Sequence, residues 1–592
     1  MKNTFLFIIL TFIFCSSSYA QYSFSQPDFF RTKRNLPLLD FPTKIDVKLS
    51  DFNAIPNDGK DDMPAINKAL NFCKKMALTG TGVKLIFEKG TYDLFNNNKN
   101  NKRTHLLNLN NTQNILIDGN GAEIIIHDPL KGFFSIFKSE NIIVKNLIID
   151  YDPLPFTQGK ITGVDIKGKT FDFKIDEGFP SLNLDMFQKA NRIWGMLMDP
   201  KIPGKLKDGA PNYYNTKDFE ELEPGTFRIK MKGPRLLKFM EVGDLYVHVA
   251  RNNGSTIFKS NMSKNITYLN NTSYTSPAGS YAAVNMEEWN IIGCQVKLKE
   301  GRIHSANADC MHINGGKFGP WIENSLFEGY SDDAINLKTT KRHILKQLSS
   351  TELIMKWNVV KGDILRIYNP REGKFIGTYT VVENKFLGDQ QMRVKLDKPL
   401  QEKINVGETK KNDIAYIDNQ SNESFVIRNN TFRNARRYGI LIQASNGLIE
   451  RNYFENLSQS AISIINGVDW GEGFIAHNIT INQNIFKNCG YDETYLNEKD
   501  FATIQMRVMK LKNLNSKTKW SGVALSDWQG LENIKITNNI FSYNKRALSI
   551  ENSTNTLIKG NKFMRSSNDL SKEHELILNR NNSNLIFEVD KK

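Results

Sequence analysis

Short segments that alternate apolar and polar positions recur along most of the chain. Each unit is a run of β-branched and apolar residues, an Asn-containing turn, and then an aromatic or aliphatic residue. The clearest copies are residues 141–149, 424–432, 478–486 and 533–541. A second set of short strands lies between such units, at 438–442, 460–464 and 547–550. One unit cannot bury its apolar side alone, so the units are predicted to stack on one another.

This repeat predicts the fold class. Asparagine tolerates the left-handed backbone that sharp corners require, and its amide can hydrogen-bond from one coil to the next. A β-sandwich of ordinary hairpins is the alternative, but Asn-Gly hairpin turns are sparse and the repeat returns at 22–24 residues. The sequence therefore predicts an all-β protein, a right-handed parallel β-helix (a solenoid).

One helix is predicted at the start of the repeat. Between Asp62 and Ala77, apolar residues recur at helical spacing. Asp62 is placed to cap the N-terminus of this helix, and Pro64 suits its first turn. An N-terminal capping helix would cover the open end of the solenoid, where strand edges are otherwise unpaired.

Two stretches, 160–250 and 342–415, lose the Asn-rich repeat and gain alternating strands bounded by glycine. Both are predicted to be small inserted antiparallel β domains, barrel-like, that wall a cleft. The predicted organisation is a signal peptide, three β-helix parts and the two insertions between them. The signal peptide covers 1–20, and the β-helix parts cover 45–159, 251–341 and 416–592, the last with a tail.

The N-terminus is typical of an export signal. It has Lys2, an apolar run at 5–14 that is too short to span a bilayer, and small residues before Gln21. Cys15 raises the alternative of a lipid anchor, which the bulky Phe14 before it disfavours. No later segment has the ~18 apolar residues of a membrane helix. We expect a soluble bacterial protein that is periplasmic or secreted.

Charge and cysteine content bear on which partners and ligands the protein can have. The formal net charge is +15, but basic residues are interleaved with acidic ones and form no run or motif for nucleic acid, so nucleic acid is not an expected partner. The cysteines beyond the signal lack zinc-ligand spacing and are expected to be free and buried. No cofactor is predicted, and the oligomeric state is left open.

Three aspartates are the candidate catalytic residues. Asp309 and Asp333 hold equivalent positions, 24 residues apart, in two segments that otherwise match. They are therefore predicted to stack on neighbouring coils about 4.8 Å apart, with Asp332 beside them. We place them at a corner of the coil, where side chains no longer alternate between inward and outward. Uncompensated carboxylates in an apolar core would carry a large free-energy penalty.

Carboxylates this close cannot all ionise freely, so at least one pKa should rise. An inverting glycosidase needs one protonated carboxyl for the leaving oxygen and one carboxylate to activate water. The structural alternative is that the Asp-Asp pair begins a turn and Asp309 caps a corner. Two motifs in register one coil apart favour the catalytic interpretation. Three carboxylates could also hold calcium, but no metal is predicted.

The coil after the Asp-Asp pair brings two arginines and a tyrosine beside the carboxylates. An arginine there can orient a hydroxyl-rich sugar or hold an aspartate ionised, although a surface arginine pair beside a tyrosine is also common. Trp470, in a loop two coils further on, could stack on a sugar ring. The alternative is a purely structural role. The candidate substrate-binding residues are Asn307, Lys338, Arg436, Arg437, Tyr438 and Trp470.

These motifs resemble those of family 28 of the glycoside hydrolases, the polygalacturonases. The matching residues are Asn-Ala-Asp309 and Asp332-Asp333. In that family the first aspartate of the doublet is the acid and the other two position water. This chain has Arg-Tyr-Gly at 437–439 where that family has Gly-His-Gly, and it lacks the Arg-x-Lys motif that binds uronate. A galacturonate substrate is therefore disfavoured.

Over most of the chain the sequence is more similar to family 110, the exported bacterial α-1,3-galactosidases. The resemblance rests on the contexts of the aspartates at 304–309 and 329–338. It implies a β-helix with barrel insertions and an inverting exo-hydrolase. Such an enzyme removes terminal α-1,3-linked galactose, as on blood-group B-type and linear glycans. We assign Asp332 as general acid, and Asp309 with Asp333 as the pair that activates water.

Two alternatives to this function are kept. One is a polygalacturonase-like hydrolase or lyase that acts on an acidic polysaccharide. The other is a non-catalytic β-helix whose aspartates only bind glycans.

Overall fold

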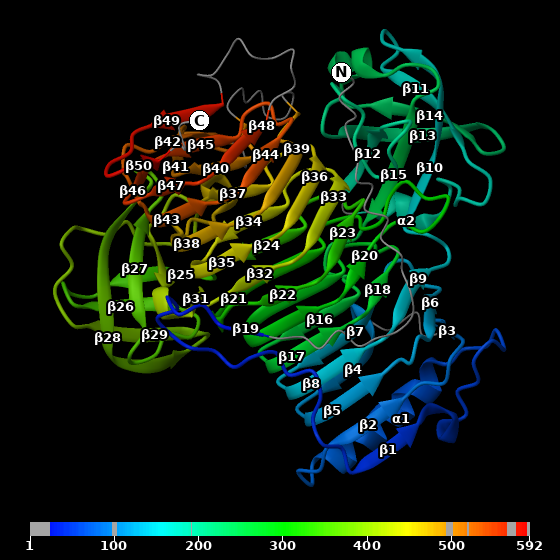
Figure 1. The fold of residues 1–592 in the computed structure, drawn as a ribbon, viewed down its shortest axis with the longest axis horizontal. Helices are drawn as coiled ribbons and strands as arrows, with labels where there is room; N and C mark the ends of the chain where they lie inside the picture. Colours follow the sequence, from blue (N-terminus) through cyan, green and yellow to red (C-terminus); the bar gives the residue numbers. More distant parts are fainter. Residues whose placement is uncertain are drawn as a thin grey trace, which may run out of the picture.

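The computed structural model describes residues 24–96, 103–190, 192–492, 501–517, 520–564 and 576–588. The predicted signal peptide at 1–20 and the alternative of a lipid anchor at Cys15 lie outside these residues. Figure 1 shows a long stack of parallel strands, with one small domain near its middle on each of two opposite sides. No helix in the described part of the chain has the length and apolar surface needed to cross a bilayer.

The stack has three faces, called here faces A, B and C. Faces A and C belong to one 25-stranded sheet, because β19 (Tyr281–Ile292) runs from face C into face A, and face B is an 11-stranded sheet. Neighbouring strands within each face are parallel. The predicted fold class, a parallel β-helix with barrel-like insertions, is confirmed.

The strands follow these bounds. Face A contains β1 (Ile45–Lys48), β2 (Val83–Ile86), β5 (Gln113–Asp118), β8 (Glu140–Lys145), β17 (Lys264–Leu269), β22 (Trp321–Glu323), β32 (Val426–Arg428), β35 (Ser445–Glu450), β38 (His477–Asn482), β43 (Leu531–Thr537), β46 (Ser553–Thr554), β47 (Leu557–Lys559) and β50 (Ile586–Glu588). Face B contains β3 (Thr91–Leu94), β6 (Glu123–Ile126), β9 (Ile148–Tyr151), β18 (Thr272–Ser273), β20 (Gln295–Val296), β23 (Leu326–Glu328), β33 (Thr431–Ala435), β36 (Tyr453–Leu457), β39 (Ile485–Cys489), β44 (Ile540–Ser542) and β48 (Lys562–Met564). Face C contains β19 together with β4 (His105–Asn110), β7 (Gly132–Phe137), β16 (Phe258–Asn261), β21 (Met311–Phe318), β24 (Ile335–Lys338), β31 (Ser421–Glu423), β34 (Ile440–Gln443), β37 (Ile462–Ile465), β40 (Ile504–Arg507), β45 (Leu548–Glu551) and β49 (Ile577–Arg580).

Asparagine explains the corners between faces. Most of the non-glycine residues with positive φ are asparagines, because their short polar side chain makes the left-handed conformation less costly. Inside the A–B corner, buried asparagines also form a ladder from coil to coil. Asn452 donates to Asn484 at 3.0 Å, and Asn484 donates to Asn539 at 3.0 Å. The repeat seen in the sequence therefore corresponds to a column of amide hydrogen bonds.

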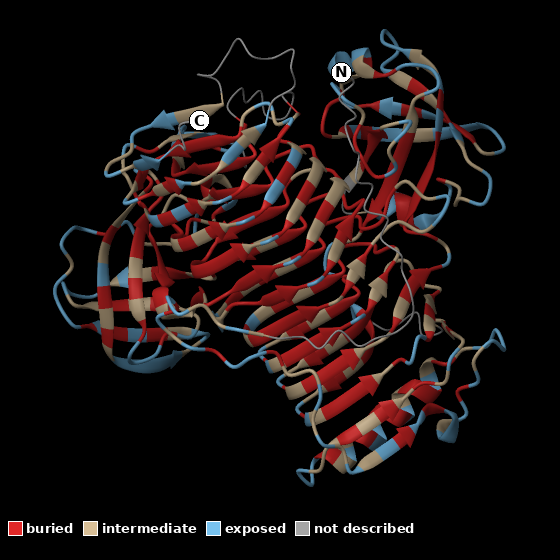
Figure 2. Ribbon diagram, in the orientation of Figure 1, coloured by how far each residue is buried: buried red, intermediate tan, exposed pale blue. Residues whose placement is uncertain are grey.

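Aromatic residues form a second column inside the helix. Stacked rings follow one another under face B, one ring per coil. The column runs through Phe327, Phe432, Phe454, Phe486, Phe541 and Phe563. The inward positions of the strands form one continuous buried core, which Figure 2 shows in red along the stack. The cysteines of the described residues are free and buried, as expected.

Helix α1 (Met63–Ala77) packs its apolar side on β1, β2, β4 and β5 and so covers one end of the core. The predicted N-cap is wrong in one respect. Asp62 precedes the helix, but its carboxylate accepts hydrogen bonds from the backbone N–H groups of Ile55 and Asp93. Asp61 accepts from the N–H of Met63 instead. Within the described residues, the remaining helical segments are α2 (Asp185–Gln188) and four 3₁₀ turns, η1 (Leu49–Phe52), η2 (Pro234–Phe239), η3 (Asp418–Gln420) and η4 (Val468–Trp470).

Two closed six-stranded barrels interrupt the solenoid. The first barrel contains β10 (Phe156–Asp165), β11 (Thr170–Ile175), β12 (Arg192–Met198), β13 (Tyr214–Glu223), β14 (Thr226–Met231) and β15 (Leu245–Arg251). The second contains β25 (Lys341–Gln347), β26 (Glu352–Lys356), β27 (Ile364–Asn369), β28 (Lys374–Gly388), β29 (Gln391–Leu396) and β30 (Ile414–Ile417). A short ribbon of β41 (Met509–Leu511) and β42 (Val523–Leu525) adds an antiparallel pair.

The position of each barrel in the coil matters for function. The first barrel lies between β9 of face B and β16 of face C, and the second follows β24 of face C. The first barrel is therefore attached at the B–C corner and the second at the C–A corner. In Figure 1 they project from opposite sides of the helix.

Candidate active site

The B–C corner brings the three aspartates together. Met311 pairs with Ile335 in neighbouring strands, so the turns before β21 and β24 stack on each other. One carboxylate oxygen from each of Asp309, Asp332 and Asp333 lies within 4.8 Å of the other two. All three residues are buried. The corner therefore concentrates three acidic groups in one small volume.

Asp332 is surrounded by arginines. Nη1 of Arg251 donates to its Oδ2 at 2.7 Å, Arg437 donates to its Oδ1, and Nη1 of Arg436 lies 3.8 Å from the same oxygen. Burial alone would raise the pKa of Asp332, but the charges of Arg437, Arg251 and Arg436 outweigh it and hold that pKa well below its usual value. The arginines therefore favour the ionised form of Asp332.

Asp333 has the opposite character. Its side chain is fully buried, Asn336 donates to its Oδ2 at 3.2 Å, and Nη1 of Arg437 lies 3.5 Å from its Oδ1. Burial raises the pKa of Asp333 well above its usual value against the pull of Arg437, and the charges of Asp332 and Asp309 raise it further. Neighbouring aspartates are thus driven to opposite protonation states, which is the arrangement that acid–base catalysis uses.

Asp309 is paired with a histidine rather than with arginines. Its Oδ2 lies 2.7 Å from Nδ1 of His312, and its Oδ1 accepts a hydrogen bond from the backbone N–H of Asp333 at 3.2 Å. The His312 side chain is 39% exposed, so this pair faces the solvent. Solvent therefore reaches His312 beside Asp309, whereas the side chains of Asp309 and Asp332 are equally exposed, at 10%.

The first barrel positions Arg436. The guanidinium lies over the rings of Trp194 and Tyr213, 5.0 and 5.5 Å from their centroids. Its Nε donates to the carbonyl of Asn212 at 2.9 Å, and Nη1 donates to the carbonyl of Ser331. This arginine is buried and serves to join the barrel to the catalytic corner, which leaves it little freedom to bind a sugar directly.

Two residues that the sequence analysis did not single out also belong to the site. His312 contacts Asp309, and its position could have been found, because it points outward from a strand whose neighbours point inward. Arg251 contacts Asp332 from the end of β15. No signal in the sequence marks Arg251, because its position depends on how the barrel docks on the helix.

The structure does not support direct substrate contact for Asn307. The residue is fully buried, its Nδ2 donates to the carbonyl of Pro155 at 2.7 Å, and its Oδ1 lies 2.9 Å from Nε2 of His304. Both the nitrogen and the oxygen of the amide therefore contact protein groups, and the nitrogen bonds to the backbone just before the first barrel begins. Tyr438 is also buried, and its ring lies 5.2 Å from the guanidinium of Arg437.

Lys338 and Trp470 lie at the other end of face C, away from the aspartates. Nζ of Lys338 donates to Glu472 at 2.6 Å. The Trp470 side chain is exposed (54%) and packs edge-to-face with Trp520 at 4.5 Å between ring centroids. These residues are not part of the carboxylate cluster, and their role in substrate binding stays a prediction.

Three carboxylates at this spacing could hold a cation. Both oxygens of Asp332 already face guanidinium groups, from Arg251 and Arg437. A divalent cation at the trio would therefore have to lie beside positive charge or displace it. The donor set fits a proton-transfer site better than a metal site.

Comparison with known proteins agrees with the fold. Residues 413–586 match a family model described as a right handed beta helix region. An alpha-1,3-galactosidase B of Akkermansia muciniphila is 25% identical over 88% of this chain and 70% of its own length. An alpha-1,3-galactosidase A of Shewanella woodyi is 24% identical over 89% of this chain and 87% of its own. The resemblance to α-1,3-galactosidases stated from the sequence is confirmed.

Solved structures give weaker matches. The family 28 exopolygalacturonase of Yersinia enterocolitica aligns over 93% of this chain and 79% of its own, with 12% identity and a TM-score of 0.42. The endo-xylogalacturonan hydrolase of Aspergillus tubingensis aligns over 90% and 98%, with 9% identity and a TM-score of 0.39. Similarities this low do not bear on the chemistry of this chain.

Proposed function

We propose that this protein is an exo-acting glycoside hydrolase that releases terminal α-1,3-linked galactose with inversion at the anomeric carbon. The observation that carries the proposal is the cluster of Asp309, Asp332 and Asp333, whose nearest oxygens lie within 4.8 Å of one another on neighbouring coils. The curated relatives named alpha-1,3-galactosidase support galactose as the sugar released. Blood-group B-type and linear α-1,3-galactosyl glycans are the proposed substrates.

The proton for the leaving oxygen comes from the Asp332–Asp333 pair. The arginines lower the pKa of Asp332 and burial raises the pKa of Asp333, which favours the proton on Asp333. The Asp332 side chain retains 10% exposure, whereas that of Asp333 has none. Asp333 therefore stores the proton, and Asp332 passes it to the glycosidic oxygen. This proposal differs from the prediction made from the sequence, in which Asp332 is the general acid and Asp309 with Asp333 activates water.

Asp309 is the proposed base. Its carboxylate removes a proton from the attacking water, and His312, 2.7 Å away, orients that carboxylate. The nearest-oxygen spacing is shorter than the span of about 6.5–9.5 Å that leaves room for water between two carboxyls in ordinary inverting enzymes. Inversion therefore requires the water to approach beside the trio, from the side of His312, rather than between the acids.

Export through the N-terminal signal is also part of the proposal. Terminal galactose occurs on glycans outside the cell, so such an enzyme would act in the periplasm or beyond it. This part rests on the composition of residues 1–20.

The substrate proposal is tested by product analysis. Purified protein is incubated with an α-1,3-galactosyl oligosaccharide, a fucosylated B-type oligosaccharide and polygalacturonate. We expect free galactose from at least one of the first two and no product from the third. An unsaturated, ultraviolet-absorbing uronate product would identify a lyase instead, and binding without release of any monosaccharide would identify a glycan-binding protein.

A further inference from the structure

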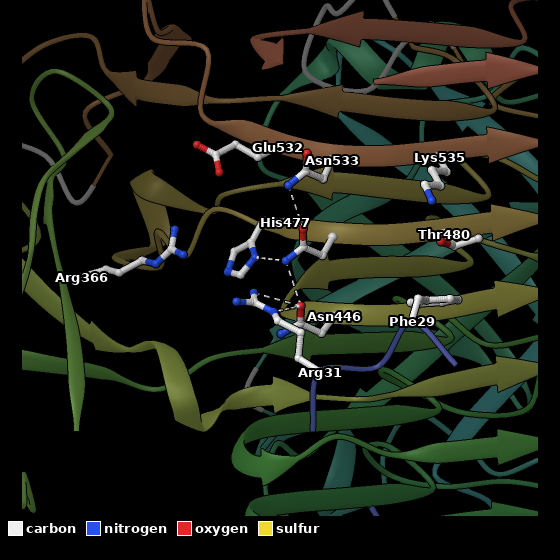
Figure 3. A pocket seen from close by; sticks show the side chains of 10 residues that line it. Phe29, Arg31, Arg366, Asn446, His477, Thr480, Glu532, Asn533 and Lys535 are labelled. Carbon is white, nitrogen blue, oxygen red and sulfur yellow. Dashed lines mark hydrogen bonds between the residues drawn. The ribbon is translucent and has the colours of Figure 1, made fainter. Parts of the chain in front are cut away.

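A cavity of about 560 Å³ lies away from the aspartates. It lies at the C–A corner, where face A begins, whereas the carboxylates lie at the B–C corner on the other side of face C. Three distant parts of the chain form it (Figure 3): the N-terminal segment with Phe29 and Arg31, Arg366 of the second barrel, and the starts of β35, β38 and β43. Its volume is in the range of about 300–1,000 Å³ that is usual for small-ligand sites.

The polar wall of this cavity is fixed by hydrogen bonds. The side chains of three successive coils form a ladder, in which Asn533 donates to Asn478 and Asn478 donates to Asn446, both at 2.9 Å. Nε and Nη2 of Arg31 donate to the same oxygen of Asn446, at 3.3 and 3.1 Å. Figure 3 shows this ladder in the centre of the cavity, with Arg31 at its lower end.

The charge of the lining is mainly positive. Arg31, Arg366 and Lys535 are cationic, and Glu532 is the acidic side chain among the residues that line the cavity. Asp418, behind the lining, lies 2.9 Å from Nε of Arg366. Among the described residues, Lys535 has no carboxylate within 4.0 Å. Arg31 also interacts electrostatically with Asp418 and Glu423. A ligand with negative charge would therefore gain attraction chiefly from Lys535, whose charge the protein has not already balanced.

Other side chains of the lining suit a sugar. The ring of Phe29 is 47% exposed and offers an apolar surface on which the apolar side of a pyranose ring can pack. Thr480 and the asparagine amides offer hydrogen-bonding groups for hydroxyls. His477 also lines the cavity, and its Nε2 lies 3.1 Å from Asp418. An aromatic ring, amides and cations in one cavity match an anionic saccharide.

We propose that this cavity is a second, non-catalytic glycan site that binds an acidic sugar unit, carrying either a sulfate ester or a carboxylate. It would hold the enzyme on acidic glycoconjugates while the aspartates act on another branch. The site does not depend on the proposed hydrolysis, because binding can be measured without turnover.

The test is isothermal titration calorimetry of the full chain at low salt. The ligands are a sulfated tetrasaccharide, a tetragalacturonate, an uncharged tetrasaccharide and inorganic sulfate. We expect one or both acidic tetrasaccharides to bind, the uncharged one to bind at least about tenfold more weakly, and affinity to fall as salt rises. The acidic ligand that binds more tightly identifies the charged group. Equal affinity for inorganic sulfate would overturn the saccharide part of the proposal.

Variants locate the binding. The double substitution Arg31→Gln and Lys535→Gln should weaken the acidic tetrasaccharide at least about tenfold, and Phe29→Ala should weaken the tetrasaccharide but not inorganic sulfate. Lys562→Gln removes a lysine charge from β48 on face B and is the matched control. The double variant could misfold, so Lys535→Gln is also measured alone. Lys535 is at an exposed strand position, where the substitution should not disturb the fold. No binding by the wild type, or equal loss in the control, would overturn the proposal.

Discussion

At the scale of single residues, the protonation of Asp332 and Asp333 decides the chemistry. Arginines keep Asp332 ionised, and burial keeps Asp333 protonated. The rate of hydrolysis should therefore fall on the alkaline side as the pair loses its proton, since the leaving oxygen then has no acid.

The role of each aspartate can be separated with leaving groups. Fluoride leaves without protonation, so Asp332→Asn and Asp333→Asn should retain far more activity on α-galactosyl fluoride than on an oligosaccharide. Asp309→Asn should lose about 10²–10⁴-fold on both substrates, because it removes the base. The measurement is kcat/KM for each variant on both substrates. Equal losses on both substrates for Asp332→Asn and Asp333→Asn would refute the acid role of the pair.

At the scale of elements, the buried asparagine ladder carries the stability of the A–B corner. Asn484 donates to the carbonyl of Ile449 and to Asn539, and it accepts from the backbone N–H of Asn452. Asn484→Ala should lower the free energy of unfolding by about 3 kcal/mol, because several buried groups lose their partners at about 1–3 kcal/mol each.

The measurement is the midpoint of chemical unfolding, followed by circular dichroism. Asn71→Ala, at an exposed position of helix α1, is the control and should leave the midpoint unchanged or slightly higher, since alanine favours the helix. An unfolding curve for Asn484→Ala that overlays the wild type would mean that the ladder contributes nothing.

At the scale of the whole molecule, the first barrel is part of the active site. Arg251 at the end of β15 lowers the pKa of Asp332 across the boundary between barrel and helix. Arg251→Met should raise that pKa, so the alkaline limb of the pH–rate profile should move to higher pH, and kcat/KM should fall about 10–100-fold because the acid is no longer held in place. Arg228→Met, which removes an exposed arginine of the same barrel, is the control. An unchanged pH–rate profile for Arg251→Met would mean that the first barrel does not contribute to catalysis.

The arrangement of the whole molecule also explains which contacts could be predicted from the sequence and which could not. The stacking of Asp309 and Asp333 followed from local alternation and a 24-residue repeat, because a solenoid turns sequence spacing directly into position. Arg251 could not be found this way, since its contact depends on docking between parts 81 residues apart. The partners of the Asp62 carboxylate and the Asn307 amide could not be found for a related reason. Both side chains bond to backbone segments that only the folded chain brings near.

The central claim is that three aspartates on neighbouring coils cleave a glycosidic bond with inversion. The most direct test is ¹H NMR of the anomeric region during hydrolysis of an α-1,3-galactosyl oligosaccharide, by the wild type and by the three single Asp→Asn variants. We predict that β-galactose is the first product of the wild type, with the α-anomer arising only by mutarotation, and that each folded variant loses most turnover. α-Galactose as the first product, or near-full turnover in any of the three variants, would contradict this account.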